Sequence, residues 1–214
     1  MDQEILSSYS KLNNFNVSRE TFSDFENYIS MILEKNKKIN IISQNTASRK
    51  AIIDRHIIDS AQIIDFVDLN RNITTDLGSG SGMPGIIVAI MLKNMNKNMN
   101  VHLYEKSYHK SQFLKEVSEK LNLKTKVFQK NIFEIKNLET GTIMSRAFKP
   151  MPIVLDLVYE NFSKYKNLIF FMGKSGKKIF ENSKKKWEFE FEEKKSLTSK
   201  DSFLINIKKI KKKN

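Results

Sequence analysis

Apolar residues at helical spacing dominate the first third of the chain and predict an amphipathic helix over 18–36. Its apolar side consists of Phe22, Phe25, Ile29, Ile32 and Leu33. Ser18 precedes it and is a suitable N-cap, because its hydroxyl can accept a hydrogen bond from a free backbone N–H of the first turn. A second helix is predicted over 46–66, with one face formed by Ile53, Ile57, Ala61 and Ile64. No strand pattern precedes residue 73, so residues 1–68 are predicted to form a helical extension.

From residue 73 onward, strand and helix patterns alternate. Strands are predicted at 73–77, 101–105, 126–129, 142–145 and 168–172. Helices are predicted at 85–94, 108–121, 152–163 and 176–186. This alternation is typical of a parallel sheet covered by helices on both faces. The segments 188–196 and 202–209 have no helix between them and should pair as a hairpin. The sequence therefore predicts an α/β, Rossmann-like domain over 69–214, with a parallel sheet closed by an antiparallel C-terminal hairpin.

Composition narrows the possibilities. The 214 residues include no cysteine, which excludes disulfides, a thiolate nucleophile and a cysteine-based zinc site. The longest apolar run, Ile86–Leu92, is too short to span a bilayer, and Met1–Glu4 does not resemble the start of a signal peptide. We therefore expect a cytoplasmic protein, monomeric by default and not bound to a membrane. The net charge of +13 favours a nucleic acid partner, although the abundance of Lys, Asn and Ile is also what AT-rich coding would produce.

The segment 76–85 gathers four of the seven glycines, at 78, 80, 82 and 85. It lies where a predicted strand becomes a helix. In an open α/β sheet, ligands bind beyond the carboxyl ends of the strands. Glycines allow the backbone to approach a ligand closely, and the following helix offers free N–H groups. The segment is therefore predicted to be a ligand-binding loop.

Two cofactors compete for this loop. Gly80, Gly82 and Gly85 match the dinucleotide fingerprint, with Glu105 about 20 residues further on. Alternatively, Asp76 and the glycines hold the amino-acid part of S-adenosylmethionine, and Glu105 binds the ribose hydroxyls. The second interpretation is favoured because an acidic strand end suits an ammonium group. The chain is also too short for a dinucleotide domain plus a typical substrate domain.

Other candidate residues lie near predicted strand ends. Arg146 is one of five arginines in a lysine-dominated chain, and its planar fork suits phosphate, carboxylate or a guanine edge. His56 and Asp59 are three residues apart and share a helical face, so they could pair near a substrate entrance or serve only as a structural pair. Phe148 could stack on a splayed base or belong to the core. Lysines that could contact RNA phosphates are Lys106, Lys110 and Lys174.

Four stretches resemble one family, the RsmG (GidB) methyltransferases. The segment 78–85 fits the family pattern GxGxGxPG, and 55–60 resembles its His-x-x-Asp-Ser signature. The pair Glu105-Lys106 resembles the end of the second strand, and 145–148 resembles the Ser-Arg-Ala segment after the fourth strand. The resemblance covers about 37–175. It departs at Lys174-Ser175, where the family has Lys-Gly, and near Asn131, where the family often has an acid.

The resemblance implies a class I S-adenosylmethionine-dependent enzyme that methylates N7 of a guanine in the 530 loop of bacterial 16S ribosomal RNA, within the small ribosomal subunit or its precursor. It implies cofactor contacts at Gly78, Met83, Asn131, Ile132 and Arg146. The loop interpretation adds Asp76, Ser79, Gly80, Gly82 and Glu105. The catalytic candidates are Arg146, His56 and Asp59.

The chemistry agrees with this expectation. Guanine N7 carries a lone pair and no proton, so attack on a methyl group needs positioning rather than a general base. The sequence offers no obvious base, nucleophile or metal cluster. The alternatives are a methyltransferase with another RNA, a protein or a small molecule as acceptor, an RNA-binding module without turnover, and an NAD-dependent reductase.

Overall fold

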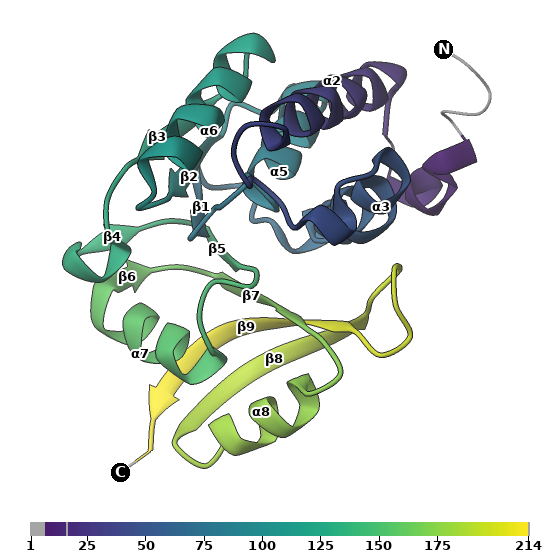
Figure 1. Cartoon of the computed structure of the whole chain (residues 1–214). Coiled ribbons are helices and arrows are strands. Elements are labelled where there is room, and N and C mark those ends of the chain that lie inside the picture. The colour runs from purple at the N-terminus through teal and green to yellow at the C-terminus, as the bar shows by residue number, and fades with distance from the viewer. Residues whose placement is uncertain (1–6, 16, 214) are drawn as a thin grey trace.

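A computed structural model describes residues 7–15 and 17–213, and its first part is helical (Figure 1). The helical elements before the sheet are η1 (Ser10–Phe15), α2 (Arg19–Asn36), η2 (Gln44–Thr46), α3 (Arg49–Ile52), η3 (Ile53–Ile57), α4 (Ile58–Ala61) and η4 (Ile64–Phe66). The helix expected over 18–36 is confirmed, and the hydroxyl of Ser18 accepts a hydrogen bond from the backbone N of Thr21 at 3.3 Å.

The single helix expected over 46–66 is wrong in detail. The chain forms α3, then a π-helical turn (η3), then α4, and ends in the 3₁₀ turn η4. A π turn holds an extra residue, so it shifts the faces of the helix that follows it. Ile53, Ile57 and Ile58 are buried here, while Arg55 is exposed. Apolar spacing alone cannot reveal such a turn because the buried positions still recur at nearly helical intervals.

A seven-stranded sheet forms the centre of the molecule, in the order β3-β2-β1-β5-β7-β9-β8. Its strands are β1 (Ile73–Leu77), β2 (Asn100–Tyr104), β3 (Thr125–Phe128), β5 (Thr142–Ser145), β7 (Asn167–Met172), β8 (Trp187–Lys195) and β9 (Phe203–Lys212). Strands β1, β2, β3, β5 and β7 are parallel, whereas β9 runs antiparallel to β7 and pairs with β8 as the expected hairpin. Successive strands lead outward from β1 in one direction and then from β5 in the other, which leaves a crevice at the carboxyl ends of these two neighbours.

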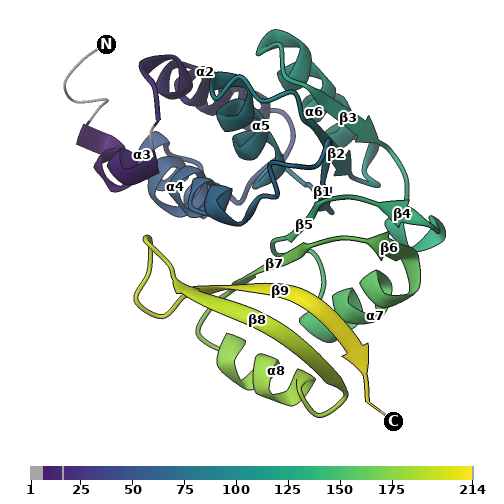
Figure 2. The same cartoon turned by 180° about the vertical axis from the view of Figure 1, so that it is seen from behind.

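Helices cover both faces of the sheet (Figures 1 and 2). They are α5 (Gly85–Asn94), α6 (Tyr108–Lys120), α7 (Met151–Asn161) and α8 (Gly176–Ser183). Neighbouring strand residues belong to different hydrophobic clusters: Met144 packs with α5 and the N-terminal helices, while Ile143 packs with α7. Alternate side chains of a strand point to opposite faces, so each cluster fills one face.

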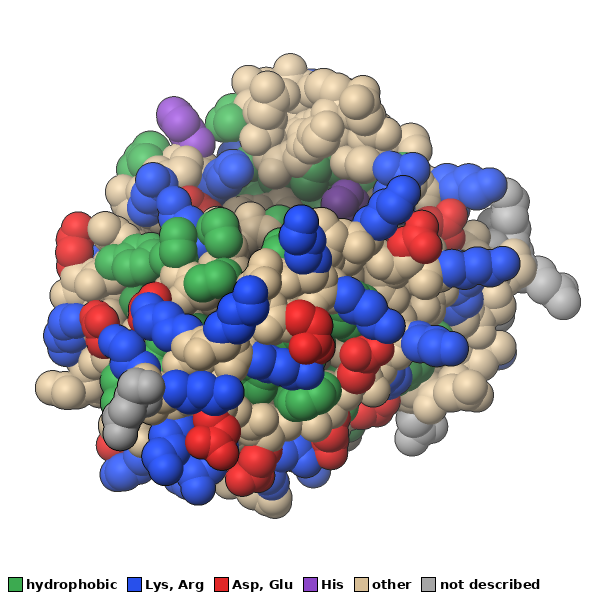
Figure 3. All heavy atoms as spheres, turned by 90° about the horizontal axis from the view of Figure 1, so that it is seen from below, with side chains coloured by type: hydrophobic (Ala, Val, Ile, Leu, Met, Phe, Trp, Pro, Cys, Tyr) green, Lys and Arg blue, Asp and Glu red, His purple; other side chains and the backbone are tan. Residues whose placement is uncertain are grey.

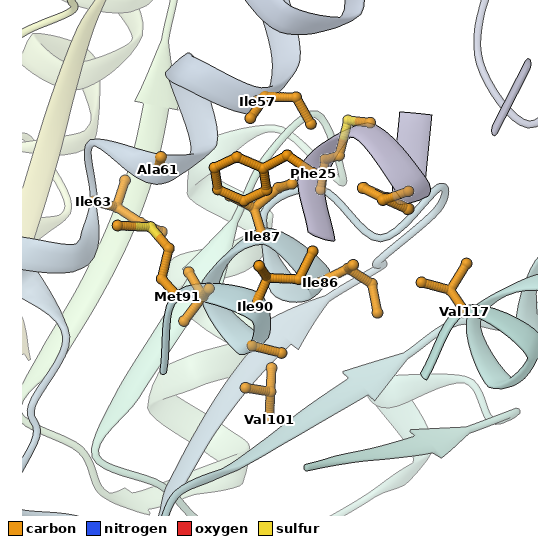
Figure 4. Packing of buried hydrophobic residues seen from close by; sticks show 14 of the residues in the cluster. Phe25, Ile57, Ala61, Ile63, Ile86, Ile87, Ile90, Met91, Val101 and Val117 are labelled. Atoms are coloured by element: carbon orange, nitrogen blue, oxygen red, sulfur yellow. The ribbon is translucent and has the colours of Figure 1, made fainter. Parts of the chain in front are cut away.

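The N-terminal helices share a core with the sheet domain. Figure 4 shows Phe25 of α2 and Ile57 beside Ile86, Ile87 and Ile90 of α5. All five of these residues are fully buried. The packing of α2 against α5 and α6 holds it beside the carboxyl end of β1. The division of the chain at residue 68 stays a prediction.

Two short strands were not expected from the sequence pattern. These are β4 (Leu138–Glu139) and β6 (Phe162–Lys164), which form a separate parallel pair, preceded by the 3₁₀ turn η5 (Ile132–Glu134). They are too short to show a periodic signal. Within 7–15 and 17–213, none of the helices combines the length and the apolar character needed to cross a bilayer.

Candidate functional site

A cavity of about 510 Å³ lies at the carboxyl ends of β1, β2, β3 and β5. Most of the residues predicted to bind a cofactor line it together: Gly78, Ser79, Gly80, Met83, Glu105, Asn131, Ile132 and Arg146. His56, Lys106, Lys110 and Phe148 also line it. Four predicted residues do not line this cavity, namely Asp59, Asp76, Gly82 and Lys174.

The glycine loop curls around one side of the cavity. Gly78 has φ +67°, and a Cβ there would lie 2.1 Å from Cδ2 of Phe148. Only glycine therefore fits beneath the Phe148 ring. Gly80 has φ +57°, and its own Cβ would meet nothing closer than a carbonyl oxygen at 3.8 Å. The loop thus presents bare backbone to open space at Gly80, as the close approach of a ligand requires.

Glu105 links the loop to the end of β2. One carboxylate oxygen accepts a hydrogen bond from the backbone N of Gly80 at 2.8 Å, and the other accepts from the backbone N of Ser107 at 2.8 Å. The side chain is fixed by these two bonds and is 8 % exposed. Carboxylate oxygens have further lone pairs, so Glu105 can still accept bonds from ligand hydroxyls.

Asp76 lies behind the loop rather than on the cavity wall. It is 1 % exposed, and its carboxylate accepts a hydrogen bond from the backbone N of Gly85, at the start of α5, at 3.1 Å. Burial raises the pKa of Asp76 to about 7, against the lowering effects of that bond and of Arg146. In the structure it anchors the start of α5, and its predicted contact with an ammonium group stays a prediction.

Arg146 is held by three groups from the helical region before the sheet. Its Nε donates to Asp59 Oδ2 at 3.2 Å, and its Nη2 donates to the carbonyl of Arg55 at 2.8 Å and to Nδ1 of His56 at 3.1 Å. The guanidinium also lies over the ring of Phe171, 5.6 Å from its centroid. His56 and Asp59 thus meet through Arg146, and no described hydrogen bond joins them directly.

His56 is neutral in this setting. Burial, followed by the charges of Arg146 and Arg55, lowers its pKa from 6.5 to about 4. Because Nδ1 accepts from a guanidinium, the ring proton sits on Nε2. That nitrogen is buried and has no partner among the described residues. His56 therefore serves as an acceptor that orients Arg146, and it cannot accept a proton readily at neutral pH.

The remaining candidates differ in their placement. The side-chain oxygen of Asn131 caps η5 by accepting a hydrogen bond from the backbone N of Phe133 at 3.3 Å. Ile132 is buried, at 3 % exposed. Phe148 is half-buried and tilts against Phe133, with ring centroids 5.9 Å apart, so it packs within the cavity wall. Lys106 and Lys110 are at the rim, whereas Lys174 is exposed and lines no described cavity.

Several residues that contact the site or line the cavity were not predicted from the sequence. Tyr28 of α2 is fully buried, and its hydroxyl donates to the carbonyl of Ser81 in the glycine loop at 2.5 Å. Gln62 is also fully buried and contacts Asp59, with 2.9 Å between Nε2 and Oδ1. Helical spacing places Tyr28 on the buried face but says nothing of its hydroxyl. Lys130 and Lys149 also line the cavity, and so do four residues of the segment before α3, Ile41, Ile42, Ser43 and Thr46.

Comparisons with known proteins agree with this geometry. The family model described as "GidB: rRNA small subunit methyltransferase G" matches residues 21–206. A relative from Pelagibacter ubique, named ribosomal RNA small subunit methyltransferase G, is 62% identical over 212 residues, which cover 99% of this chain and 100% of the relative. A protein of the same name from Bartonella henselae is 31% identical and covers 99% of this chain and 98% of its own length.

Solved structures share the fold at low sequence identity. A SAM-dependent methyltransferase from Aquifex aeolicus has a TM-score of 0.56 at 12% identity, covering 82% of this chain and 97% of that one. A SAM-dependent O-methyltransferase from Thermotoga maritima also has a TM-score of 0.56, at 14% identity, covering 87% of this chain and 72% of that one. The fold is that of the Rossmann-like class I methyltransferases. The family model and the full-length relatives together show that this chain belongs to the family of ribosomal RNA small subunit methyltransferase G, the GidB family.

Proposed function

We propose that this protein transfers a methyl group from S-adenosylmethionine to N7 of a guanine in 16S ribosomal RNA. The observation that carries the proposal is the bond from the backbone N of Gly80 to Glu105 at 2.8 Å. It places the bare glycine loop and a fixed carboxylate on one cavity wall, at the switch point of the sheet. In a chain that matches this family along nearly its whole length, that wall is the expected cofactor cradle.

The residues present fit the cofactor. Glu105 would accept hydrogen bonds from the ribose hydroxyls, and the loop at Gly78 and Gly80 would lie against the amino-acid part. Asn131 and Ile132, at the end of β3, would border the adenine. The bound cofactor supplies a methyl group on a positively charged sulfur. These assignments of individual residues to parts of the cofactor belong to the proposal.

The protein's main contribution to this reaction is to hold the two reacting atoms in line and close together. With the cofactor held in this cradle, the lone pair of guanine N7 would form the new bond to the methyl carbon as the carbon–sulfur bond breaks, and the positive charge would pass to the guanine ring. No proton leaves, so no general base is required. This suits a site whose histidine is neutral with a pKa of about 4. Asp59, 3.2 Å from Arg146, offsets the guanidinium charge that would otherwise repel a cationic product.

The RNA partner is proposed to be the small ribosomal subunit or its precursor, met in the cytoplasm by a monomer. Support comes from four lysines on the cavity rim, at 106, 110, 130 and 149. None of them forms an ion pair with a described residue, so their charges are available to phosphates. Phosphate contacts of this kind orient RNA without reading its sequence.

Transfer of radiolabelled methyl to small ribosomal subunits from a strain lacking this modification tests the proposal. We expect label at N7 of one guanine, and a loss of about 100-fold in kcat/KM for Arg146→Ala, because misplacement of about 1 Å is that costly. Arg71→Ala is the matched control, since Arg71 is exposed beside the amino end of β1 and lines a separate cavity. Wild-type protein that binds S-adenosylmethionine in calorimetry but labels no 16S guanine would contradict the proposed acceptor.

A further inference from the structure

The cavity of about 510 Å³ that contains the glycine loop is called the cofactor cavity below. A second cavity, of about 670 Å³, lies beside it. The two share His56, Arg146 and Ala147. Three other cavities of the described surface share no residue with the cofactor cavity. A methyl acceptor must reach within about 3–3.5 Å of the methyl carbon, so its base must lie in space that adjoins the cofactor. Among the five cavities described, the second is therefore the one that adjoins the cofactor cavity.

The walls of this cavity suit a flat, polar-edged ring. Phe171, Met172 and Leu204, from the ends of β7 and β9, supply apolar surface. Thr198, Ser199 and Ser202 supply hydroxyl groups from the turn that joins β8 to β9. Its volume falls within the roughly 300–1,000 Å³ typical of small-molecule sites. Arg55, at the edge, is exposed and forms no ion pair with a described residue, so it can meet a phosphate.

The β8–β9 turn, residues 196–202, is fixed against the helical region before the sheet. Figures 1 and 2 both show this turn reaching from the hairpin toward α3 and α4. Gln62 accepts a hydrogen bond from the backbone N of Leu197 at 3.0 Å, and its Nε2 donates to Asp59 at 2.9 Å. The hydroxyl of Thr198 donates to the same oxygen of Asp59 at 3.2 Å.

The other oxygen of that carboxylate binds Arg146. One partly buried hydrogen-bond network therefore fixes both the turn that walls the second cavity and the guanidinium that lies between the two cavities. A network in which each member is hydrogen-bonded is rigid, and rigidity at this junction sets the distance between the two ligands.

We propose that the second cavity holds the acceptor purine, and that Asp59 and Gln62 are positioning residues that set its shape through the β8–β9 turn. This inference rests on the proposed function, because it assigns the acceptor of the same reaction. The Nη1 group of Arg146 makes no described hydrogen bond, and together with the hydroxyls of Ser199 and Ser202 it can donate to the guanine O6, which leaves N7 free for attack.

Filling the cavity tests the assignment. Ser202 is half-buried in its wall, and its hydroxyl makes no described hydrogen bond, so Ser202→Trp adds bulk without removing a bond. Asp201→Trp is the matched control, because Asp201 is the exposed neighbour that does not line the cavity. We expect Ser202→Trp to lower kcat/KM for small ribosomal subunits by about 100-fold, with S-adenosylhomocysteine affinity unchanged in calorimetry. The control should match the wild type in both.

Several results would overturn the assignment. Wild-type turnover in Ser202→Trp would place the acceptor elsewhere, and an equal loss of S-adenosylhomocysteine affinity would show that the cavity is not separate acceptor space. If Ser202→Trp does not fold, Ser199→Trp on the exposed part of the turn takes its place. A wild-type protein that methylates no RNA would instead defeat the proposed function itself, which distinguishes the two failures.

A second pair of variants tests the positioning network. Thr198→Val removes the hydroxyl that binds Asp59 but keeps the shape of the side chain, and Thr198→Ser restores the hydroxyl. We expect Thr198→Val to raise the KM for the subunit several-fold with unchanged S-adenosylhomocysteine affinity and thermal stability close to the wild type. Thr198→Ser should recover the KM. Equal KM values in all three proteins would show that the network does not shape the acceptor site.

Discussion

Arg146 is the residue at which the candidate functional groups converge. Its bonds to Asp59, His56 and the Arg55 carbonyl come from a segment about 90 residues earlier in the chain. The spacing of His56 and Asp59 allowed a functional or a purely structural pair, and only the family resemblance favoured a functional role. The structure instead makes both of them partners of Arg146. A helical spacing of three residues shows that two side chains share a face, but it cannot show which third group stands between them.

His56 gives a pH prediction. Its pKa is lowered from 6.5 to about 4, so between these values the unfolded chain binds a proton that the folded protein excludes. The contribution of His56 to stability is therefore complete above pH 6.5 and is lost as the pH falls toward 4. We expect an NMR titration of the His56 ring to show a midpoint well below 6.5. A midpoint at or above that value would contradict the burial of the ring beside Arg146.

Glu105 gives a prediction for cofactor affinity. Glu105→Gln replaces the charged acceptor of the Gly80 and Ser107 amides, which is also the acceptor proposed for the ribose hydroxyls. Hydrogen bonds to charged groups are worth roughly 1.5–3 kcal/mol, so we expect the Kd for S-adenosylhomocysteine to rise by about 10- to 100-fold in calorimetry. Glu116→Gln is the control, because Glu116 pairs with Lys35 on the surface and lines no part of the cofactor cavity. An unchanged Kd in Glu105→Gln would remove Glu105 from the cofactor site.

At the scale of elements, helix α2 contacts the glycine loop and stabilises its conformation. The Tyr28 hydroxyl binds the Ser81 carbonyl, and a Cβ on Gly82 would come within 2.9 Å of that hydroxyl. Gly82 therefore faces the packed helices rather than the cavity. The loop is held from behind by α2 and from the front by Glu105, which explains how a glycine-rich segment can keep one conformation.

Tyr28→Phe tests this contact. The variant loses one buried hydrogen bond and leaves the Ser81 carbonyl without a donor, so we expect the free energy of unfolding in urea to fall by about 1–3 kcal/mol. The loosened loop should also bind S-adenosylhomocysteine several-fold more weakly. Tyr108→Phe, at a tyrosine that is 59% exposed, should change neither quantity. Wild-type affinity in a destabilised Tyr28→Phe protein would mean that α2 supports the fold but not the loop.

At the scale of the whole molecule, positive charge is abundant but dispersed. Figure 3 shows Lys and Arg side chains spread over one face with Asp and Glu between them. Many lysines are neutralised locally: Lys35 pairs with Glu116 at 2.8 Å and Lys93 with Asp24 at 2.9 Å. The net charge of +13 already subtracts these acids, so it gives the total excess of positive charge but not its location. The unpaired lysines on the rim of the cofactor cavity are where a phosphate backbone would meet positive charge beside the site.

Salt dependence distinguishes rim charges from paired ones. Each phosphate contact adds about 0.7–0.9 to the slope of log K against log salt concentration. We expect Lys106→Gln combined with Lys110→Gln to reduce the slope for a 16S ribosomal RNA fragment by about 1.4–1.8. The control combines Lys35→Gln and Lys93→Gln, which removes the same charge from paired lysines, and should leave the slope unchanged. Equal reductions in both double variants would indicate a delocalised attraction without rim contacts.

The sequence by itself determined the parallel sheet, its closing hairpin and the glycine loop. These depend on local features, namely apolar periods and glycines at a strand-to-helix junction, which act over a few residues. The strands predicted at 73–77 and 142–145 match β1 and β5 residue for residue. The expected cofactor class followed from that loop together with Glu105, and the expected family followed from four stretches, the loop among them. The family is confirmed along 21–206.

Only the tertiary structure decided how distant segments meet. The π turn that splits the expected helix, the burial of Gln62 and the contact of Tyr28 with the loop depend on packing partners far away in the chain. The same holds for Asp76, whose acidic side chain looks suited to a ligand in sequence but bonds to Gly85 behind the loop. Periodicity fixes which face of an element is apolar. The atoms that a buried polar group will find there are set by the three-dimensional arrangement of the elements, because hydrogen bonds require particular partners at about 3 Å.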